Sequence, residues 1–258
     1  MDALRDAELT ALLGTLDVGG GGPDPSWATR CARLLELDGL SVSTQAGSAE
    51  LLWYSGDVSA RLDDLQFTLG EGPSVEAATA GSLLLVTDVR RTPGPRWPAF
   101  VPGAAELGVR AVFAFPLRLG AISIGAMTGY RREPHPLSEK CLDAALTLCD
   151  ALTVYLLSGY LPPAREGDPP GPAATAGAAR TGPYENGQTE QPAELHRAVV
   201  HQASGMLSID LKVDLATALD RLRAYAFAHN RPIVAVSRDI VARRLRLTVD
   251  RPEGRSDA

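Results

Sequence analysis

Residues 162–193 divide the chain, because their composition cannot support a packed core. They read PPAREGDPPGPAATAGAARTGPYENGQTEQPA, in which proline, glycine and alanine dominate and Tyr184 is the only aromatic residue. A segment with so few large apolar side chains cannot offset the entropy cost of ordering it, so it is predicted to be a flexible linker. The sequence therefore predicts two domains, a body of residues 1–161 and a tail of residues 194–249.

The two parts differ in charge. Residues 194–251 contain ten basic and six acidic residues, a net charge of +4, whereas the whole chain carries −6, so the remaining residues carry −10. This balance argues against nonspecific nucleic-acid binding by the whole chain, but it leaves room for binding by the locally basic tail. We therefore expect the tail to bind a partner and the body to control it.

Several features indicate a cytoplasmic protein without a membrane span. The first residues place acids where a secretory signal would have a basic end followed by an apolar run. The sequence has no run of about 18 apolar residues, the length that would suggest a spanning helix. Its cysteines are too few, and odd in number, for a disulfide framework; they are Cys31, Cys141 and Cys149.

The body alternates helical and strand patterns. Strand patterns cover residues 40–44, 50–55, 83–86, 109–117 and 121–127, with a hairpin turn at 118–120. Helical patterns cover residues 3–16, 26–37, 73–80, 99–108 and 137–157. This order predicts an α+β domain with a central antiparallel sheet flanked by helices.

The helical pattern at 137–157 has an unusually wide apolar face. Its main stripe consists of Leu137, Cys141, Ala145, Leu148, Leu152 and Tyr155. Further apolar residues lie beside that stripe, so the apolar arc covers roughly half of the circumference or more. Such an arc can pack on the sheet and on a partner helix, so we expect a parallel homodimer through this helix, alone or together with residues 3–16. The alternative is a fully buried core helix.

Three motifs of the body resemble a known domain. They are QFTLGEGP (66–73), RWPAF (96–100) and GVRAVFAFPL (108–117), and the likeness extends over residues 25–158. The body is similar to the GAF domain of actinobacterial regulators. This resemblance implies a sensor of a small molecule or a protein partner, with a ligand pocket between sheet and helices.

The sequence does not identify a ligand or cofactor. Lys140 is the only lysine before Lys212, which argues against the lysine-containing residue set of cyclic-nucleotide GAF domains, and no cysteine precedes a histidine as in bilin-binding relatives. We interpret Cys141 and Cys149 as small core residues. His135 is predicted to be a surface residue, and Asp63 and Asp64 a solvated loop pair. No metal site is expected.

The tail carries three apolar stripes at helical spacing, which predict an all-α three-helix bundle. The stripes are Leu195, Val199, Ala203 and Met206; Leu215, Leu219, Leu222 and Ala226; and Ile233, Val236, Ile240 and Leu245. Pro232 suits the first position of the third helix.

The tail is similar to the ANTAR domain of transcription antitermination regulators. The matching segments are QASGML (202–207), ALDRLRAYAFAHNRPI (218–233) and VSRDIVARRL (236–245). The resemblance implies binding of RNA, namely paired stem-loops in a nascent transcript, which prevents a terminator hairpin from forming.

RNA binding requires cationic groups for phosphates and polar groups for bases. The predicted RNA-binding residues are Gln202, Ser204, Gly205, Arg223, His229, Arg231 and Arg238. Ser204 stands where many ANTAR domains have a lysine. Each arginine alone is readily explained as a solvating charge, but the group on one small bundle favours RNA.

Other functions remain open at this stage. The tail could be a helix-turn-helix that binds DNA, with its turn near residues 229–232, or a module that binds another protein. An enzyme is not expected, because the sulfoxide reductases among GAF-like folds use a nucleophilic cysteine in a loop. We therefore expect a signal-responsive regulator without catalytic activity.

Overall fold

The structure is a computed structural model that describes residues 2–17, 22–45, 49–160 and 196–247. The predicted linker at 162–193 lies outside these described residues, so the predicted domain boundaries stay a prediction. The chain separates into two compact units, with the division between Leu195 and His196.

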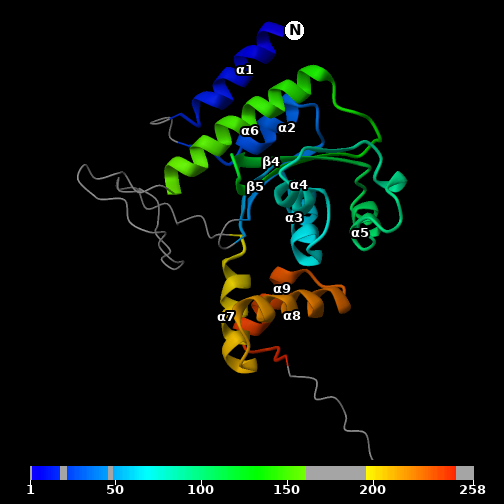
Figure 1. Ribbon diagram of the computed structural model, residues 1–258, viewed down its shortest axis with the longest axis vertical. Coiled ribbons are helices and arrows are strands. Elements are labelled where there is room, and N and C mark those ends of the chain that lie inside the picture. Colours follow the sequence, from blue (N-terminus) through cyan, green and yellow to red (C-terminus); the bar gives the residue numbers. More distant parts are fainter. Residues whose placement is uncertain (1, 18–21, 46–48, 161–195, 248–258) are drawn as a thin grey trace, which may run out of the picture. The chain divides into compact units, whose positions relative to one another are not determined.

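A five-stranded antiparallel sheet forms the centre of the first unit (Figure 1). Its strands are β1 (Gly39–Thr44), β2 (Leu51–Tyr54), β3 (Leu84–Val86), β4 (Ala111–Leu119) and β5 (Ile122–Arg131). The strands lie in the order β2-β1-β5-β4-β3. The structure thus confirms the predicted α+β class, although β4 begins and ends two residues later than expected, β5 is longer than expected, and their turn lies at Gly120 and Ala121.

Helices cover both faces of this sheet (Figure 1). On one face lie α1 (Asp2–Gly14), α2 (Trp27–Leu34) and α6 (Glu139–Tyr160). On the other face lie α3 (Asp57–Leu69), α4 (Pro73–Ala80) and α5 (Phe100–Glu106), while the short 3-10 helix η1 (Val89–Arg91) precedes α5. The sequence predicted these helices except for α3 and η1, and it assigned Asp63 and Asp64 of α3 to a solvated loop.

The alternation of side chains along β4 builds two apolar cores. Phe113 and Phe115 belong to the core shared with α1, α2 and α6, whereas Val112 belongs to the core shared with α3 and α5. Both faces of the strand are therefore buried. Each fully buried side chain of this size contributes roughly 1.5–3 kcal/mol, so β4 is a main source of stability for the unit.

The GEGP motif connects three helices through its backbone and the Glu71 side chain. Gly70 ends α3 and Gly72 precedes α4, and both have positive φ angles, which glycine adopts without strain. Between them, Glu71 accepts hydrogen bonds of 2.8 Å from the backbone nitrogens of Ala99 and Phe100 at the start of α5. The motif thus fixes how the helices on this face enter the layer.

By length and composition alone, residues Glu139–Ser158 of α6 could cross a membrane. However, Cys141, Ala145, Leu148 and Leu152 are fully buried in the first unit, as in the core helix of a domain. The absence of a membrane span stays a prediction.

The second unit is a bundle of three helices: α7 (Ala198–Leu211), α8 (Leu215–Ala228) and α9 (Ile233–Val241). This confirms the predicted all-α tail. The buried stripe of α7 consists of Val200, Ala203 and Leu207, so it is rotated by about one residue from the prediction. Asp214 caps α8 by accepting a 2.9 Å hydrogen bond from the backbone nitrogen of Thr217.

Gly125 provides a test of the sheet. A Cβ atom at this position of β5 would overlap the carbonyl oxygen of Ser43 on β1. Gly125→Ala should therefore lower the free energy of unfolding by about 1–3 kcal/mol. Chemical denaturation followed by tryptophan fluorescence measures this, because Trp27, Trp53 and Trp97 all lie in the first unit.

Gly14→Ala is the matched control. Gly14 lies in α1 with no atom within 4 Å of the position that a Cβ would take. Its replacement should leave the denaturation midpoint unchanged or slightly raised. Equal midpoints for the two variants would contradict the close approach of β1 and β5.

Candidate nucleic-acid interface

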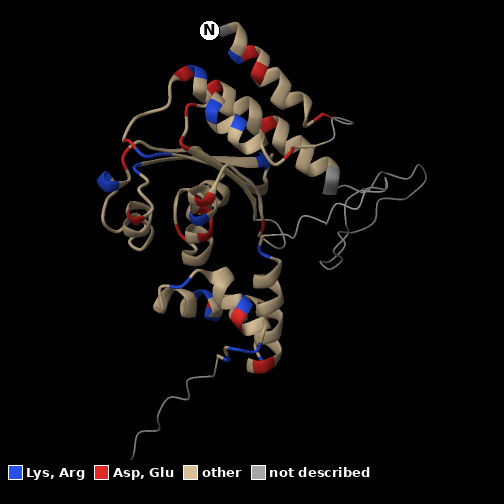
Figure 2. Cartoon of the chain, turned by 180° about the vertical axis from the view of Figure 1, so that it is seen from behind, with Lys and Arg blue, Asp and Glu red and all other residues tan. Residues whose placement is uncertain are grey.

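The predicted RNA-binding residues come from all parts of the second unit. Gln202, Ser204 and Gly205 lie on α7, Arg223 on α8, His229 and Arg231 at the α8–α9 turn, and Arg238 on α9. Gln202, His229 and Arg238 are exposed, whereas Arg223 and Arg231 are partly buried. Figure 2 shows how basic positions alternate with fewer acidic ones in this unit.

Ser204 lies inside the bundle. Its side chain is only 2% exposed, and its hydroxyl donates a 2.9 Å hydrogen bond to the carbonyl oxygen of Val200. A short hydroxyl in a helix commonly bonds the carbonyl four residues earlier. Since this geometry turns the hydroxyl away from the surface, we leave Ser204 out of the proposed interface.

Gly205 lies on an open part of α7. No heavy atom lies within 4 Å of the position that its Cβ would occupy. Gln202 is three residues earlier and shares that helix face. Together they leave a stretch of α7 that another molecule can approach closely.

Arg223 is held by its own helix. Its Nη1 donates to Oδ1 of Asp220 at 3.3 Å, three residues earlier. Burial lowers the pKa of the Arg223 guanidinium, while the hydrogen bond with Asp220 opposes this shift. The side chain is therefore less available for a phosphate than its place in the sequence suggested.

Arg231 and Arg244 share one carboxylate. Nη2 of Arg231 donates to Oδ2 of Asp239 at 2.6 Å. Nε and Nη2 of Arg244 lie 2.9 and 2.8 Å from Oδ1 of the same residue. The hydrogen bonds from Arg231 and then Arg244 lower the pKa of Asp239 below its usual value. The carboxylate is thus ionised near neutral pH and joins two arginines that are distant in sequence.

An aromatic pair lies at the end of α8. The rings of Tyr225 and His229 are stacked with centroids 3.9 Å apart and an interplanar angle of 19°. His229 Nδ1 also lies 2.9 Å from the carbonyl oxygen of Tyr225. His229 is exposed and Tyr225 is half-buried, and aromatic rings of this kind can stack with unpaired bases.

Sequence reasoning missed Tyr225, Asp239 and Arg244. The spacing of four residues between Tyr225 and His229 on one helix face was a usable signal. The Arg231–Asp239 pair joins the inter-helix turn to the third helix, so only the folded bundle could show it.

In the first unit, polar side chains are buried between the sheet and α3. Ser43 Oγ donates to Oδ1 of Asp63 at 2.9 Å, and Gln66 Oε1 accepts from the backbone nitrogen of Ser74 at 2.8 Å. Thr128 is buried on β5, and its hydroxyl has no hydrogen-bond partner among the described residues. The prediction that Asp63 is solvated was wrong, because the residue lies on α3 and is hydrogen-bonded.

The cysteines lie in helices, not in loops. Cys31 is on α2, Cys141 and Cys149 are on α6, and all three are free and buried. Burial raises the pKa of the Cys31 and Cys149 thiols. Among the described residues, no group of three or more His, Cys, Asp or Glu could hold a metal ion.

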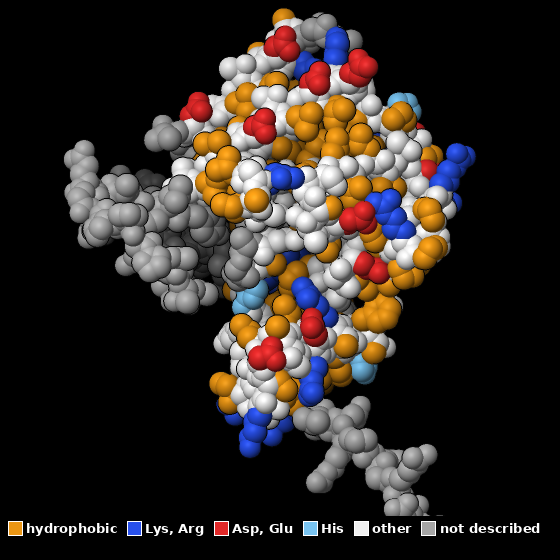
Figure 3. Space-filling view, viewed as in Figure 1, with side chains coloured by type: hydrophobic (Ala, Val, Ile, Leu, Met, Phe, Trp, Pro, Cys, Tyr) orange, Lys and Arg blue, Asp and Glu red, His pale blue; other side chains and the backbone are white. Residues whose placement is uncertain are grey.

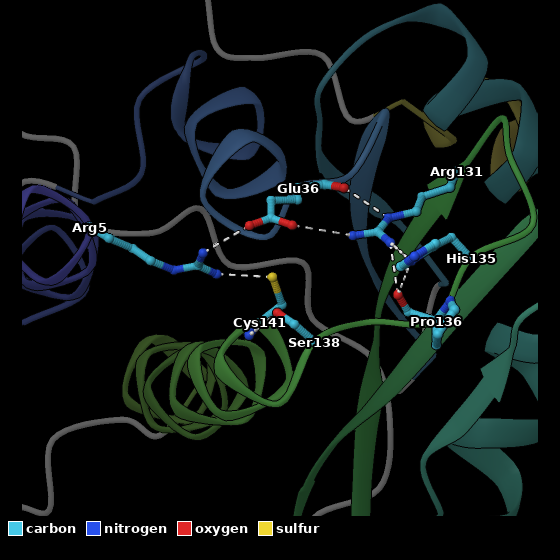
Figure 4. Close-up of polar contacts among 7 residues, drawn as sticks. All are labelled: Arg5, Glu36, Arg131, His135, Pro136, Ser138 and Cys141. Atoms are coloured by element: carbon cyan, nitrogen blue, oxygen red, sulfur yellow. Dashed lines mark hydrogen bonds and ion pairs between the residues drawn. The ribbon is translucent and has the colours of Figure 1, made fainter. Parts of the chain in front are cut away.

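Figure 4 shows the surroundings of Cys141. Arg5 on α1 donates to Sγ of Cys141 at 2.9 Å and to Glu36 at 3.1 Å. On the other side of Glu36, Arg131 donates to the Glu36 and Pro136 carbonyl oxygens at 2.9 and 2.8 Å. This network ties α1 to the end of α2 and the start of α6. His135 is exposed beside it, as predicted for a surface residue.

Comparison with known proteins supports the two-part organisation. The ANTAR domain family model matches residues 191–241. A search of curated proteins gave no match. The matched residues include α7, α8 and α9 of the second unit.

Solved structures similar to the chain include two GAF domains and an enzyme. The GAF domain of a Coxiella burnetii phosphoenolpyruvate-protein phosphotransferase is 15% identical, with a TM-score of 0.45 over 60% of this chain and 94% of that one. Free methionine-R-sulfoxide reductase from Neisseria meningitidis, in complex with its substrate, is 15% identical, with a TM-score of 0.45 over 60% of this chain and 90% of that one. The phycocyanobilin-bound GAF domain of a cyanobacterial phytochrome is 16% identical, with a TM-score of 0.44 over 60% of this chain and 94% of that one.

The buried cysteines lead to a prediction about reactivity. An aromatic disulfide reagent should not react with the native protein on a time scale of minutes, because the thiols are inaccessible and those of Cys31 and Cys149 have raised pKa values. In denaturant all three thiols should react. Absorbance of the released thiolate measures both. Fast native labelling that Cys31→Ser removes would instead indicate a nucleophilic cysteine.

Proposed function

We propose that the chain is a signal-responsive regulator that binds paired RNA stem-loops in nascent transcripts and acts in transcription antitermination. The observation that carries this proposal is the ANTAR match at residues 191–241, which spans the three-helix bundle. RNA would bind to the second unit, and the first unit would sense a small molecule or a protein partner.

The chemistry of the bundle supports RNA as the partner. Arg238 is exposed, and Arg231 is held by Asp239 with 39% of its side chain exposed, so both can approach phosphates. The Tyr225–His229 stack offers a flat surface for bases. Gln202 and Gly205 add a hydrogen-bonding group and an open backbone on α7.

A homodimer would help the bundle to engage two stem-loops. Linking two weak binding modules raises their effective concentration, so dimer geometry offers a point of control. Apolar side chains gather over α6 (Figure 3). Among them, Leu146 and Val154 are exposed on α6, and Leu4 is exposed on the neighbouring α1. We propose this α1–α6 surface as the contact between two copies.

RNA binding is tested with the full chain and a transcript that contains two hairpins. Arg231→Ala combined with Arg238→Ala should weaken binding about tenfold or more, because two charge-assisted contacts are lost. The slope of log affinity against log salt should fall by about 1–2. Filter binding at several salt concentrations measures both quantities.

Arg90→Ala combined with Arg91→Ala is the matched control, because it removes the same two charges from exposed positions of the first unit. Its affinity and salt slope should equal those of the wild type. Stronger binding to a DNA duplex of matched sequence would favour the DNA-binding alternative. Absence of RNA binding by the wild type would contradict the proposal. A protein partner captured by the chain would then favour the alternative in which the tail binds another protein.

The dimer is tested by light scattering at micromolar concentration. Leu146→Glu combined with Val154→Glu should give a monomer, because it places charges at two exposed apolar positions of α6 within the proposed contact. Ile122→Glu is the control, since Ile122 is 61% exposed and Val154 65% exposed, but Ile122 lies at the start of β5. A wild-type protein that is monomeric at this concentration would contradict the dimer proposal.

A further inference from the structure

We infer that Asp239 is a positioning residue for RNA, which holds the guanidinium groups of Arg231 and Arg244 at a fixed separation for a backbone phosphate. The inference rests on the proposed RNA-binding function. Asp239 itself would make no contact with RNA, because a carboxylate repels phosphate. It would act through the two arginines.

The geometry of the group supports this role. Arg231 lies before α9, Asp239 within it and Arg244 after it, so the three residues span the helix from one end to the other. Each oxygen of the carboxylate serves one arginine: Oδ2 accepts from Arg231 at 2.6 Å and Oδ1 from Arg244 at 2.9 Å. Charge-assisted hydrogen bonds of this kind are strong and directional.

The backbone supports the same arrangement. The main-chain carbonyl of Asp239 accepts hydrogen bonds from the backbone nitrogens of Arg244 at 2.8 Å and Leu245 at 3.1 Å. Arg243, just before Arg244, has a positive φ angle that turns the chain back at the end of α9. Arg244 is therefore brought to Asp239 by the end of the helix as well as by its side chain.

The group keeps donors for a ligand. Two guanidinium groups against one carboxylate leave a net charge of +1. The side chains of Arg231 and Arg244 are 39% and 64% exposed, whereas that of Asp239 is 24% exposed. An arginine carries five N–H donors, and the carboxylate engages only one of Arg231 and two of Arg244. The remaining donors can reach a phosphate.

Positioning and plain charge neutralisation predict opposite effects of one substitution. Asp239→Asn raises the positive charge of the bundle by one, so an interface governed by net charge alone would bind RNA more tightly. If the carboxylate positions the arginines, its loss frees both side chains, and RNA binding must then order them again. Ordering costs about two- to tenfold in affinity for each long side chain.

The experiment compares full-chain variants by filter binding to a two-hairpin transcript and to a scrambled RNA of the same length. Asp239→Asn should bind the hairpins about fivefold or more weakly than the wild type and should lose discrimination against the scrambled RNA. Asp239→Glu keeps the carboxylate and should recover most of the affinity. Circular dichroism and a thermal melt verify that each variant is folded.

Asp210→Asn is the matched control, because it makes the same charge change at an exposed position of α7. It should bind the hairpins as tightly as the wild type or slightly more tightly. If Asp239→Asn behaves in the same way and keeps its discrimination, the positioning role is wrong while the RNA-binding proposal stands. If the wild type does not bind the hairpins, the proposed function itself fails.

Discussion

The burial of both faces of the β4–β5 hairpin is the constraint on which the first unit depends. Phe113 and Phe115 point into the core formed with α1, α2 and α6, while Val112 and Tyr130 point into the core formed with α3 and α5. A sheet that is apolar on both faces must be covered on both, which requires helices from before and after the hairpin. The networks at Glu71 and Arg5 then fix how those helices meet the sheet.

The sequence predicted the elements whose apolar patterns are local. It failed where a buried polar side chain is hydrogen-bonded to a residue that is distant in the sequence. The apolar run at 109–117 and the wide stripe at 137–157 gave β4 and α6 directly. In contrast, α3 was missed because Asp63 and Asp64 look like a solvated pair in a loop. Asp63 is buried because Ser43, twenty residues away on β1, donates a hydrogen bond to it. Periodicity carries no information about such a partner.

The candidate interface shows the same division. The three helices and most of the exposed polar residues followed from spacing. However, the observed buried face of α7 is rotated by one residue from the predicted face, so Ser204, which was expected on the surface, lies inside the bundle. A helix as short as α7 allows two neighbouring apolar stripes, Val199 with Met206 and Val200 with Leu207, and packing on α8 and α9 selects between them. Likewise, the sequence identified Arg231 as a cation but could not show that Asp239 orients it.

In the proposed RNA-binding function, acidic residues inside a basic interface reconcile the modest charge of the tail with selective binding. A net charge of +4 attracts any polyanion weakly, and adding more cations would strengthen binding to every RNA alike. Asp220 and Asp239 instead lower that general attraction while they hold Arg223, Arg231 and Arg244 in place. Affinity then depends on whether phosphates match the fixed donors, so discrimination between RNAs arises from geometry more than from charge.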